Sequence, residues 1–294
     1  MAGTGQRLIE SRLEIFHHSH ILVYLCTPLM HGYNRAVMPG NLDHLCVVLV
    51  STRNPLNIGA AARAMSNLGF LRLRVVNPYE ASFREARSAV GAAELLANAE
   101  EYGSVAEAVA DCALVVGTTA ARDRELQQPL KALQQAAPAI RKRLSAGQRV
   151  ALLFGSEKRG LANDDLSYCN WLLHIPTREE HVSMNLGQAV AICLYELARE
   201  ASSGGKHSRR AVQKSEKLEP ALAGQNERIT TMLIDALRAS GYLEQKPVAA
   251  KEEKIRRMVR RLELSSDDAE LWLGMLRQMV WKMKTPGDHK KEDR

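Results

Sequence analysis

Three short segments of the chain concentrate the polar, charged and small residues that a catalytic site requires. They span residues 57–63, 154–160 and 183–188, and they contain amides, hydroxyls, a carboxylate, a lysine and two arginines. Each comes shortly after an apolar run that is expected to form a strand. Because ligands of α/β proteins bind at the carboxyl ends of strands, we expect the three segments to form one composite site.

The common nucleotide-binding and hydrolase motifs do not occur in these segments. No G-x-G-x-x-G follows the first predicted strand, so a dinucleotide site of the Rossmann type has no support. Residues 155–160 have the glycine spacing of a P-loop, but Leu161 and Ala162 stand where a lysine and a hydroxyl residue are required. The chain also lacks the G-x-S-x-G elbow of serine hydrolases. The residues alone therefore indicate an α/β enzyme with a polar site.

Strands alternate with helices between residues 41 and 200. Apolar, β-branched runs predict strands at 45–50, 71–76, 113–116, 150–154 and 171–175. Helices are expected at 58–68, 91–96, 105–110, 129–144 and 186–200. Asn57 is expected to cap the first helix and Gly69 to close it. This alternation predicts an α/β fold, a mostly parallel sheet with helices on both faces.

The chain changes character on both sides of this region. Residues 1–40 combine a histidine cluster with turn formers, and we expect an N-terminal extension that is disordered or not native, with Met38 as an alternative start. Residues 201–219 are expected to be a basic linker. Three amphipathic stripes within 220–285 predict a small helical bundle, followed by a disordered tail at 286–294.

Composition narrows the class of protein. Apolar residues make up 46% of the 294 residues, which is enough for a sizeable core. The five cysteines form no C-x-x-C pair, which indicates a reduced, cytoplasmic protein without a disulfide framework or a metal site. The longest apolar run near the N-terminus is too short to span a membrane, so we expect no membrane partner.

The distribution of charge points to a polyanionic partner. The net charge of +7 is moderate, but basic residues concentrate in the linker and near residue 257. Four arginines lie off the apolar stripe of their predicted helix, and we expect them to face solvent or RNA phosphates: Arg256, Arg257, Arg260 and Arg261. Aromatic residues are only 5% of the chain, which argues against binding of single strands mainly by stacking.

Three sequence motifs in a fixed order carry a resemblance to a known family. They read NPLNIGAAARA at 54–64, ALLFGSEKRGL at 151–161 and VSMNLGQAV at 182–190, with support from VVNP at 75–78 and VVGTT at 115–119. In this order and spacing the chain resembles the TrmH-type branch of the SPOUT RNA methyltransferases. Within that branch it is similar to the TrmJ-like tRNA 2′-O-methyltransferases. The likeness covers roughly residues 44–200.

The resemblance implies a fold and an activity that the residues alone do not. It implies a trefoil knot in the C-terminal part of the sheet domain and a homodimer whose interface completes each methyl-donor pocket. It also implies transfer of a methyl group from S-adenosyl-L-methionine to a ribose 2′-hydroxyl of tRNA, at the cytidine or uridine of nucleotide 32, with S-adenosyl-L-homocysteine as product. The helical tail would help to hold tRNA, and DNA is not expected as a partner. Two alternatives remain open, an rRNA 2′-O-methyltransferase of the same fold and a non-catalytic RNA-binding knot protein.

The resemblance also assigns the methyl-donor pocket to particular residues. In this family the main chain grips the donor, and small residues let the backbone approach it. The matching positions are Thr118, Thr119, Ala120, Phe154, Gly155, Glu157, Ile175, Ser183 and Met184. The residues on their own are equally compatible with ordinary turns at the ends of strands. No metal is required.

Four residues, one of them already assigned to the donor pocket, match the family's catalytic positions. Arg63 matches an essential arginine, and since a guanidinium stays protonated in proteins, we expect it to hold a phosphate of the RNA and acidify the hydroxyl rather than remove its proton. Asn57 would orient the ribose or cap its helix. Ser183 and Asn185 would position Arg63 or the acceptor, or cap the helix that follows them.

Overall fold

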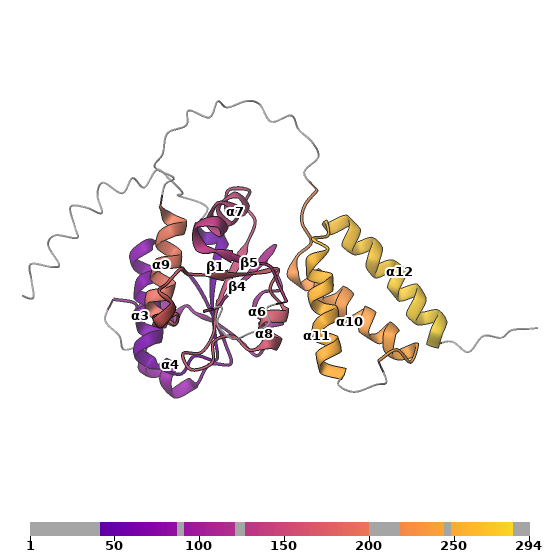
Figure 1. The fold of residues 1–294 in the computed structure, drawn as a ribbon, viewed down its shortest axis with the longest axis horizontal. Coiled ribbons are helices and arrows are strands. Elements are labelled where there is room, and N and C mark those ends of the chain that lie inside the picture. Colours follow the sequence, from indigo (N-terminus) through magenta and orange to yellow (C-terminus); the bar gives the residue numbers. More distant parts are fainter. Residues whose placement is uncertain (1–41, 87–90, 121–126, 200–217, 244–247, 285–294) are drawn as a thin grey trace, which may run out of the picture. The chain divides into compact units, whose positions relative to one another are not determined.

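The computed structural model describes residues 42–86, 91–120, 127–199, 218–243 and 248–284 (Figure 1). The predicted N-terminal extension, nearly all of the predicted basic linker and the predicted tail lie outside the described residues. The domain boundaries inferred from the sequence therefore stay predictions.

Seven strands form one sheet in the order β3-β2-β1-β6-β4-β7-β5. In chain order they are β1 (Leu45–Val50), β2 (Arg72–Val76), β3 (Glu100–Tyr102), β4 (Leu114–Thr118), β5 (Leu130–Ala132), β6 (Val150–Phe154) and β7 (Trp171–His174). Every pair of neighbouring strands is parallel. The predicted parallel character of the sheet is confirmed, and the carboxyl ends of β1, β4, β6 and β7 share one edge.

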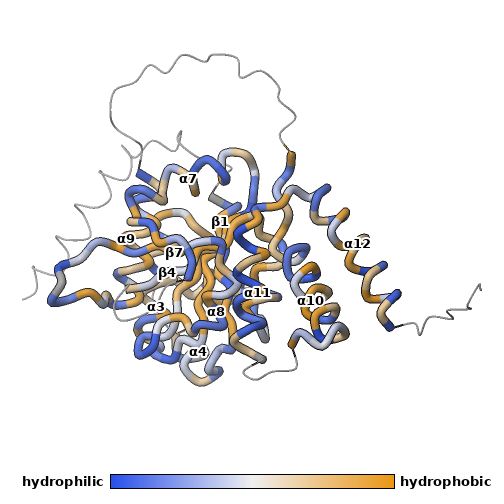
Figure 2. Tube along the Cα trace, turned by 45° about the vertical axis from the view of Figure 1, so that its right-hand side comes forward, coloured by the Kyte–Doolittle hydropathy of each residue, from blue (hydrophilic) through white to orange (hydrophobic). Residues whose placement is uncertain are grey.

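Helices cover both faces of the sheet, as the sequence predicts. They are α3 (Pro55–Leu68), α4 (Glu80–Ala86), α5 (Ala93–Ala97), α6 (Val105–Ala108), α7 (Leu133–Ser145), α8 (Asn163–Ser167) and α9 (Leu186–Ala198), with short 3-10 turns η1 (Leu42–His44) and η2 (Glu179–His181). Alternate residues of a strand point to opposite faces. Val47 of β1 joins the core under α3, α7 and α9, whereas Val48 joins the core under α6 and α8. Figure 1 shows these two helical layers, and Figure 2 shows the apolar strands between them.

Four short elements are not predicted by the sequence: β3, β5, α4 and α8. The strands β3 and β5 are three residues long and form the two edges of the sheet, so no alternating apolar pattern marks them. The predicted beginning of the helix at 129–144 was wrong. Residues Leu130–Ala132 form β5, which pairs with β7, and the helix α7 begins at Leu133. Helices α4 and α8 span only seven and five residues, too few for a helical period to show.

The N-terminus of α3 differs from the prediction. The helix begins at Pro55, and Asn54 is its cap, with Oδ1 of Asn54 accepting a 3.0 Å hydrogen bond from the backbone N–H of Leu56. The predicted cap, Asn57, lies inside the first turn, so the prediction of its capping role was wrong. The predicted stop at Gly69 is confirmed, since Gly69 adopts a left-handed conformation with φ of 80°.

An ion-pair cluster around the buried side chain of Arg74 joins β2 to the residues that precede β4. Arg74 is 2% exposed, and its guanidinium donates to both carboxylate oxygens of Asp111, at 2.6 and 2.8 Å, and to Glu100 at 3.0 Å. Arg149 also bonds Asp111. Burial by itself would raise the pKa of Asp111, but the hydrogen bonds and charge of Arg74, and then those of Arg149, outweigh burial and hold that pKa well below its usual range.

Three longer helices follow, at the positions of the predicted amphipathic stripes: α10 (Ala223–Ala239), α11 (Val248–Arg261) and α12 (Ser266–Lys284). Ile229, Val259 and Leu276 belong to one apolar cluster that the three helices share. The predicted stripe of α11 is partly wrong, because Met258 and Leu262 are 42% and 45% exposed. None of the helices in the described ranges is long and apolar enough to cross a membrane.

Candidate active site

A pocket of about 310 Å³ opens where β4, β6 and β7 end. All nine residues that the resemblance assigns to the methyl donor line this pocket: Thr118, Thr119, Ala120, Phe154, Gly155, Glu157, Ile175, Ser183 and Met184. The fold therefore brings together four segments that lie far apart in the sequence. We call this cavity the donor pocket. Its lining also includes Thr177, which lies outside the three motifs; Thr177 follows β7, and its place after a strand is the signal that could have found it.

Close backbone contacts explain the glycine at the centre of the second motif. A side chain at Gly155 would place its Cβ 2.0 Å from the carbonyl carbon of Gly160, a distance that no packing adjustment accommodates. The same loop closes through a 2.7 Å hydrogen bond from the N–H of Gly160 to the carbonyl of Ser156, with Gly160 at φ of 66°. The loop thus depends on a residue without a side chain at position 155, where it lines the donor pocket.

The wall formed by the end of β4 is anchored from two sides. Thr118 donates through its hydroxyl to the carbonyl of Leu153 at 2.8 Å, and the N–H of Thr119 donates to the carbonyl of Leu173 at 3.0 Å. Gly117 lies below them, where a Cβ would come within 2.8 Å of the sulfur of Cys169. These contacts leave little freedom to the backbone of residues 117–119, so this wall is formed before any ligand binds.

Hydrogen bonds join the three motifs beside the donor pocket. The side-chain amide of Asn57 donates to Oε1 of Glu157 at 3.1 Å, and the amide of Asn185 donates to Oδ1 of Asn57 at 2.6 Å. Oε1 of Glu157 also accepts from the N–H of Asn54 at 3.3 Å. Oδ1 of Asn185 caps α9 by accepting from the N–H of Gly187 at 2.9 Å, which confirms the predicted capping role. One side chain from each motif thus belongs to a single polar chain.

Arg63 is not part of this polar chain. It lies on the exposed side of α3 and does not line the donor pocket, and no hydrogen bond or ion pair joins it to another described residue. Ser183 lines the pocket, whereas Arg63 does not. The single chain therefore assembles the donor pocket without the arginine. Within the described ranges, no group of three or more His, Cys, Asp and Glu side chains is placed to hold a metal ion.

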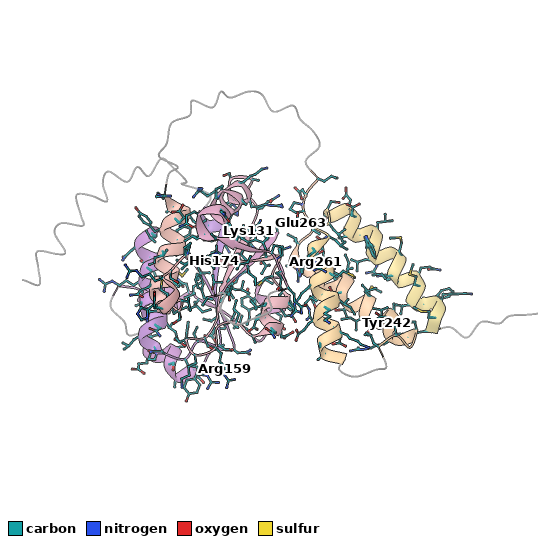
Figure 3. The ribbon with its side chains drawn as sticks, in the orientation of Figure 1. Lys131, Arg159, His174, Tyr242, Arg261 and Glu263 are labelled. Atoms are coloured by element: carbon teal, nitrogen blue, oxygen red, sulfur yellow. The ribbon has the colours of Figure 1, made fainter. Side chains whose placement is uncertain are left out.

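A second pocket, of about 870 Å³, lies on the other side of the 156–160 loop. Its walls are this loop, the residues that follow β1 and the N-terminus of α8, and they include Arg53 and Lys158. Figure 3 labels Arg159, a further wall residue, at the end of the sheet domain where Figure 1 labels α4. We call this cavity the outer pocket. Arg53 lies just outside the first motif; its position in the polar loop after β1 is the signal that could have found it.

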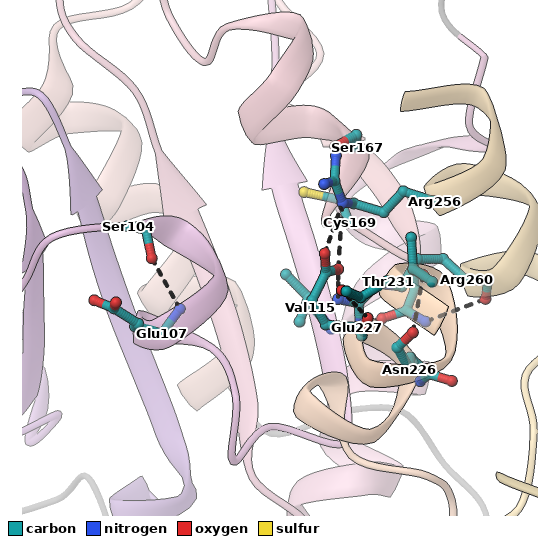
Figure 4. Close-up of polar contacts among 12 residues, drawn as sticks. Ser104, Glu107, Val115, Ser167, Cys169, Asn226, Glu227, Thr231, Arg256 and Arg260 are labelled. Atoms are coloured by element: carbon teal, nitrogen blue, oxygen red, sulfur yellow. Dashed lines mark hydrogen bonds and ion pairs between the residues drawn. The ribbon is translucent and has the colours of Figure 1, made fainter. Parts of the chain in front are cut away.

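Three of the four arginines of α11 lie where they were not expected. Arg260 is 2% exposed and Arg257 is 7% exposed, and the side chain of Arg256 is 13% exposed. Figure 4 shows Arg256 and Arg260 with their contacts, among them the carboxylate of Glu227 on α10, which lies 3.1 Å from Arg256 and 3.5 Å from Arg260. The prediction that these three face solvent or phosphate was wrong.

The physical reason is that α11 packs its polar side against α8. Arg256 donates to the hydroxyl of Ser167 at 3.0 Å and lies 4.4 Å from the centre of the Tyr168 ring. Arg257 donates to the side chain of Gln127 at 2.8 Å. Burial lowers the pKa of Arg260 below its ordinary value. Only Arg261 of the four is exposed, so it alone is available to a phosphate.

A family model for the SpoU rRNA Methylase family matches residues 44–195, which hold both the donor pocket and the polar chain. The chain belongs to this family. TrmJ of Sodalis glossinidius (strain morsitans), a tRNA (cytidine/uridine-2′-O-)-methyltransferase, is 34% identical over 244 residues, which cover 80% of this chain and 91% of that relative. TrmJ of Pseudomonas aeruginosa (strain UCBPP-PA14), a tRNA (cytidine/uridine/adenosine-2′-O-)-methyltransferase, is 41% identical over 157 residues, which cover 53% of this chain and 61% of that relative.

The crystal structure of TrmJ from Z. mobilis ZM4 superposes with a TM-score of 0.67 and 30% identity, covering 80% of this chain and 98% of that one. The resemblance inferred from the three motifs is thereby confirmed. Because the alignment with the Sodalis relative is longer than the SpoU methylase span, the likeness to TrmJ includes residues outside that span.

Proposed function

We propose that the chain transfers a methyl group from S-adenosyl-L-methionine to a ribose 2′-hydroxyl of tRNA, at the cytidine or uridine of nucleotide 32. One observation carries this proposal: the nine residues that the sequence motifs assign to the methyl donor line a single pocket. The tRNA 2′-O-methyltransferase names of the TrmJ relatives support the substrate class. Nucleotide 32 rests on the resemblance to TrmJ-like enzymes alone.

The donor pocket fits a nucleoside attached to an amino acid. Main-chain groups around Gly155 and Thr119 would hold the adenosine, and Met184 and Ile175 would supply apolar contacts. When bound, the sulfonium supplies an activated methyl group, and the products are an RNA methyl ether, S-adenosyl-L-homocysteine and a proton. Glu157 lies on the wall of this pocket and would place its negative charge near the sulfonium.

The role of Arg63 requires a second copy of the chain. Arg63 shares an exposed face of α3 with Leu56, which is 80% exposed, and with Ala60. The neighbouring helix α9 exposes Ile192 and Tyr195. We infer a homodimer that covers this apolar surface and brings Arg63 of one protomer to the donor pocket of its partner. There the guanidinium would hold a phosphate of the RNA and stabilise the developing oxyanion.

The knot belongs to the same proposal. Strand β6 lies between β1 and β4, and β7 lies beyond β4, an order that supports a crossing of the chain between β6 and β7. The segments where this crossing would lie, near residues 155–161 and 175–184, line the donor pocket. A trefoil knot in this region would fix both walls at once. The helices α10, α11 and α12 would hold a distant part of the tRNA, with Arg261 on their exposed surface.

The printed description of the SpoU family favours rRNA as a second candidate substrate. Incubation of the protein with labelled S-adenosyl-L-methionine and either tRNA or rRNA transcripts separates the two. We expect label only in tRNA, at the 2′-oxygen of nucleotide 32, as read by mapping of modified nucleotides. Label in rRNA alone would replace the proposed substrate. If calorimetry detects no donor binding and no RNA is labelled, although the protein still binds RNA, the chain is an RNA-binding protein without transferase activity.

A further inference from the structure

The outer pocket has a basic rim directly beside the donor pocket. The two pockets share the 156–160 loop as a common wall, and the opposite wall of the outer pocket is formed by Ser51, Arg53 and Asn54. Arg53 and Lys158 are both exposed there. An RNA backbone that continues past this shared loop from a ribose at the donor pocket would bring a neighbouring nucleotide to the outer pocket.

The backbone at this rim is held in an unusual conformation. The adjacent strands β1 and β2 each end in a residue other than glycine with a positive φ, Ser51 at 52° and Asn77 at 49°. Each of them donates its N–H to the neighbouring strand, Ser51 to Val76 at 2.9 Å and Asn77 to Tyr102 at 3.1 Å. Such conformations cost about 1 kcal/mol or more and concentrate at functional sites. They turn the chain sharply at both strand ends, just before Arg53 and Tyr79.

Arg53 and Tyr79 form an exposed pair at this rim. The Arg53 guanidinium lies 5.9 Å from the centre of the Tyr79 ring, and Tyr79 is 55% exposed. The backbone of Arg53 is fixed by Ser82, which is 7% exposed and donates its hydroxyl to the Arg53 carbonyl. A fixed backbone that carries an exposed aromatic ring under a planar cation is a surface on which a base can stack.

We propose that Arg53 and Tyr79 bind the nucleotide next to the acceptor in a single-stranded stretch of RNA. The unpaired base stacks on the Tyr79 ring, and Arg53, with Lys158 across the outer pocket, contacts the phosphate that joins this nucleotide to the acceptor. The inference rests on the proposed function and deepens it. It assigns the outer pocket to the flanking nucleotide and makes both residues determinants of RNA binding rather than of the methyl-transfer step.

The experiment uses the full-length protein, S-adenosyl-L-methionine and a tRNA anticodon stem-loop, either intact or with one abasic site beside the acceptor. We expect Tyr79→Ala to raise the KM for the intact stem-loop about tenfold, because stacking on an aromatic ring contributes strongly to the binding of each base. The kcat and the affinity for S-adenosyl-L-methionine should stay within about twofold, since the donor pocket is unchanged. Tyr79→Phe should behave like the wild type.

The abasic stem-loop separates stacking from a structural role. Removal of the flanking base should weaken wild-type binding but leave Tyr79→Ala unaffected, because the partner of the ring is then already lost. Arg53→Ala should reduce the slope of binding against salt concentration by about one, whereas Arg53→Lys should retain it. Leu71→Ala, which removes a side chain that is 60% exposed at the opposite end of β2, is the matched control.

Two results would overturn the inference. One is a wild-type KM in Tyr79→Ala, and the other is an equal loss of binding to intact and abasic stem-loops in that variant. Either leaves the proposed function standing as long as the wild type methylates the stem-loop. Failure of the proposed function is a different result, in which the wild type methylates no RNA at all. In that case, binding measurements still test the stacking site. The wild type should bind the intact stem-loop more tightly than the abasic one, and Tyr79→Ala should bind both equally.

Discussion

The side-chain amide of Asn57 lies 3.1 Å from the carboxylate of Glu157, although 100 positions separate the two residues in the chain. This hydrogen bond joins the first turn of α3 to the wall shared by the donor pocket and the outer pocket. Asn185 extends the link to the cap of α9. The polar chain thus places the three motifs in a fixed relation around the space where acceptor and donor would meet.

Removal of either member of the pair should affect activity more than stability. We expect Asn57→Ala and Glu157→Ala each to lower kcat/KM at least tenfold, with a loss of stability of about 1 kcal/mol, since both side chains form hydrogen bonds near the surface. The double variant should lose little more than either single one, because both changes break the same contact. Steady-state kinetics and thermal melts measure the two effects. Glu94→Ala, a change at an exposed residue far from the pocket, is the control, and additive losses would contradict the coupling.

Arg63 provides a test of the dimer. Arg63→Ala should abolish transfer while donor binding stays within a few-fold, because the arginine does not line the donor pocket of its own chain. Ser183→Trp should block donor binding but leave Arg63 intact. When these two inactive variants are mixed and allowed to exchange subunits, each mixed dimer has one complete site, so activity should return to about a quarter of the wild-type level. No recovery, with exchange verified by native mass spectrometry, would show that Arg63 acts within its own chain or not at all.

The arginines of α11 should separate into two roles. Glu227→Ala leaves the buried charge of Arg260 without its carboxylate, and we expect this change to reduce stability by about 3 kcal/mol. Arg261→Ala should leave the melting temperature unchanged but weaken tRNA binding and reduce its salt slope by about one. Glu270→Ala, at an exposed position of α12, is the control for the first change. A loss of stability in Arg261→Ala equal to that in Glu227→Ala would contradict this division.

The Asp111 cluster should make stability depend on pH in the acid range. The pKa of Asp111 is lower in the folded chain than its ordinary value of about 3.9, so its contribution to stability is fully present above that value and declines as the pH falls below it. We expect Asp111→Asn to reduce stability by about 2 kcal/mol at pH 7, because the buried guanidinium of Arg74 then loses its partly exposed carboxylate partner. Denaturant titrations from pH 7 to pH 3 should show the gap between variant and wild type narrowing below pH 4. A constant gap would be inconsistent with the lowered pKa.

Much of the fold could be predicted from local patterns. The runs at 45–50 and 150–154 match β1 and β6 to the residue, because strands buried on both faces are continuously apolar. Edge strands such as β3 carry charged residues and form only because a neighbouring strand offers hydrogen bonds, so their sequence contains no signal. The wrong prediction that Asn57 caps α3 has a similar reason. An asparagine that caps a helix and one that donates to a distant carboxylate look alike in a sequence.

The sequence by itself determined the family and which residues line the donor pocket. Three motifs in a fixed order identify these residues, and the pocket requires their small size and polarity. Tertiary structure decided the partner of each side chain. Packing of α11 against α8 turned Arg256, Arg257 and Arg260 inward, although their spacing indicated a solvated face. Strand β6 lies between β1 and β4 in the sheet, and this position places Glu157, in the loop after β6, beside Asn57. Contacts between distant segments depend on how elements pack in three dimensions, and a periodic pattern within one element carries no information about its neighbours.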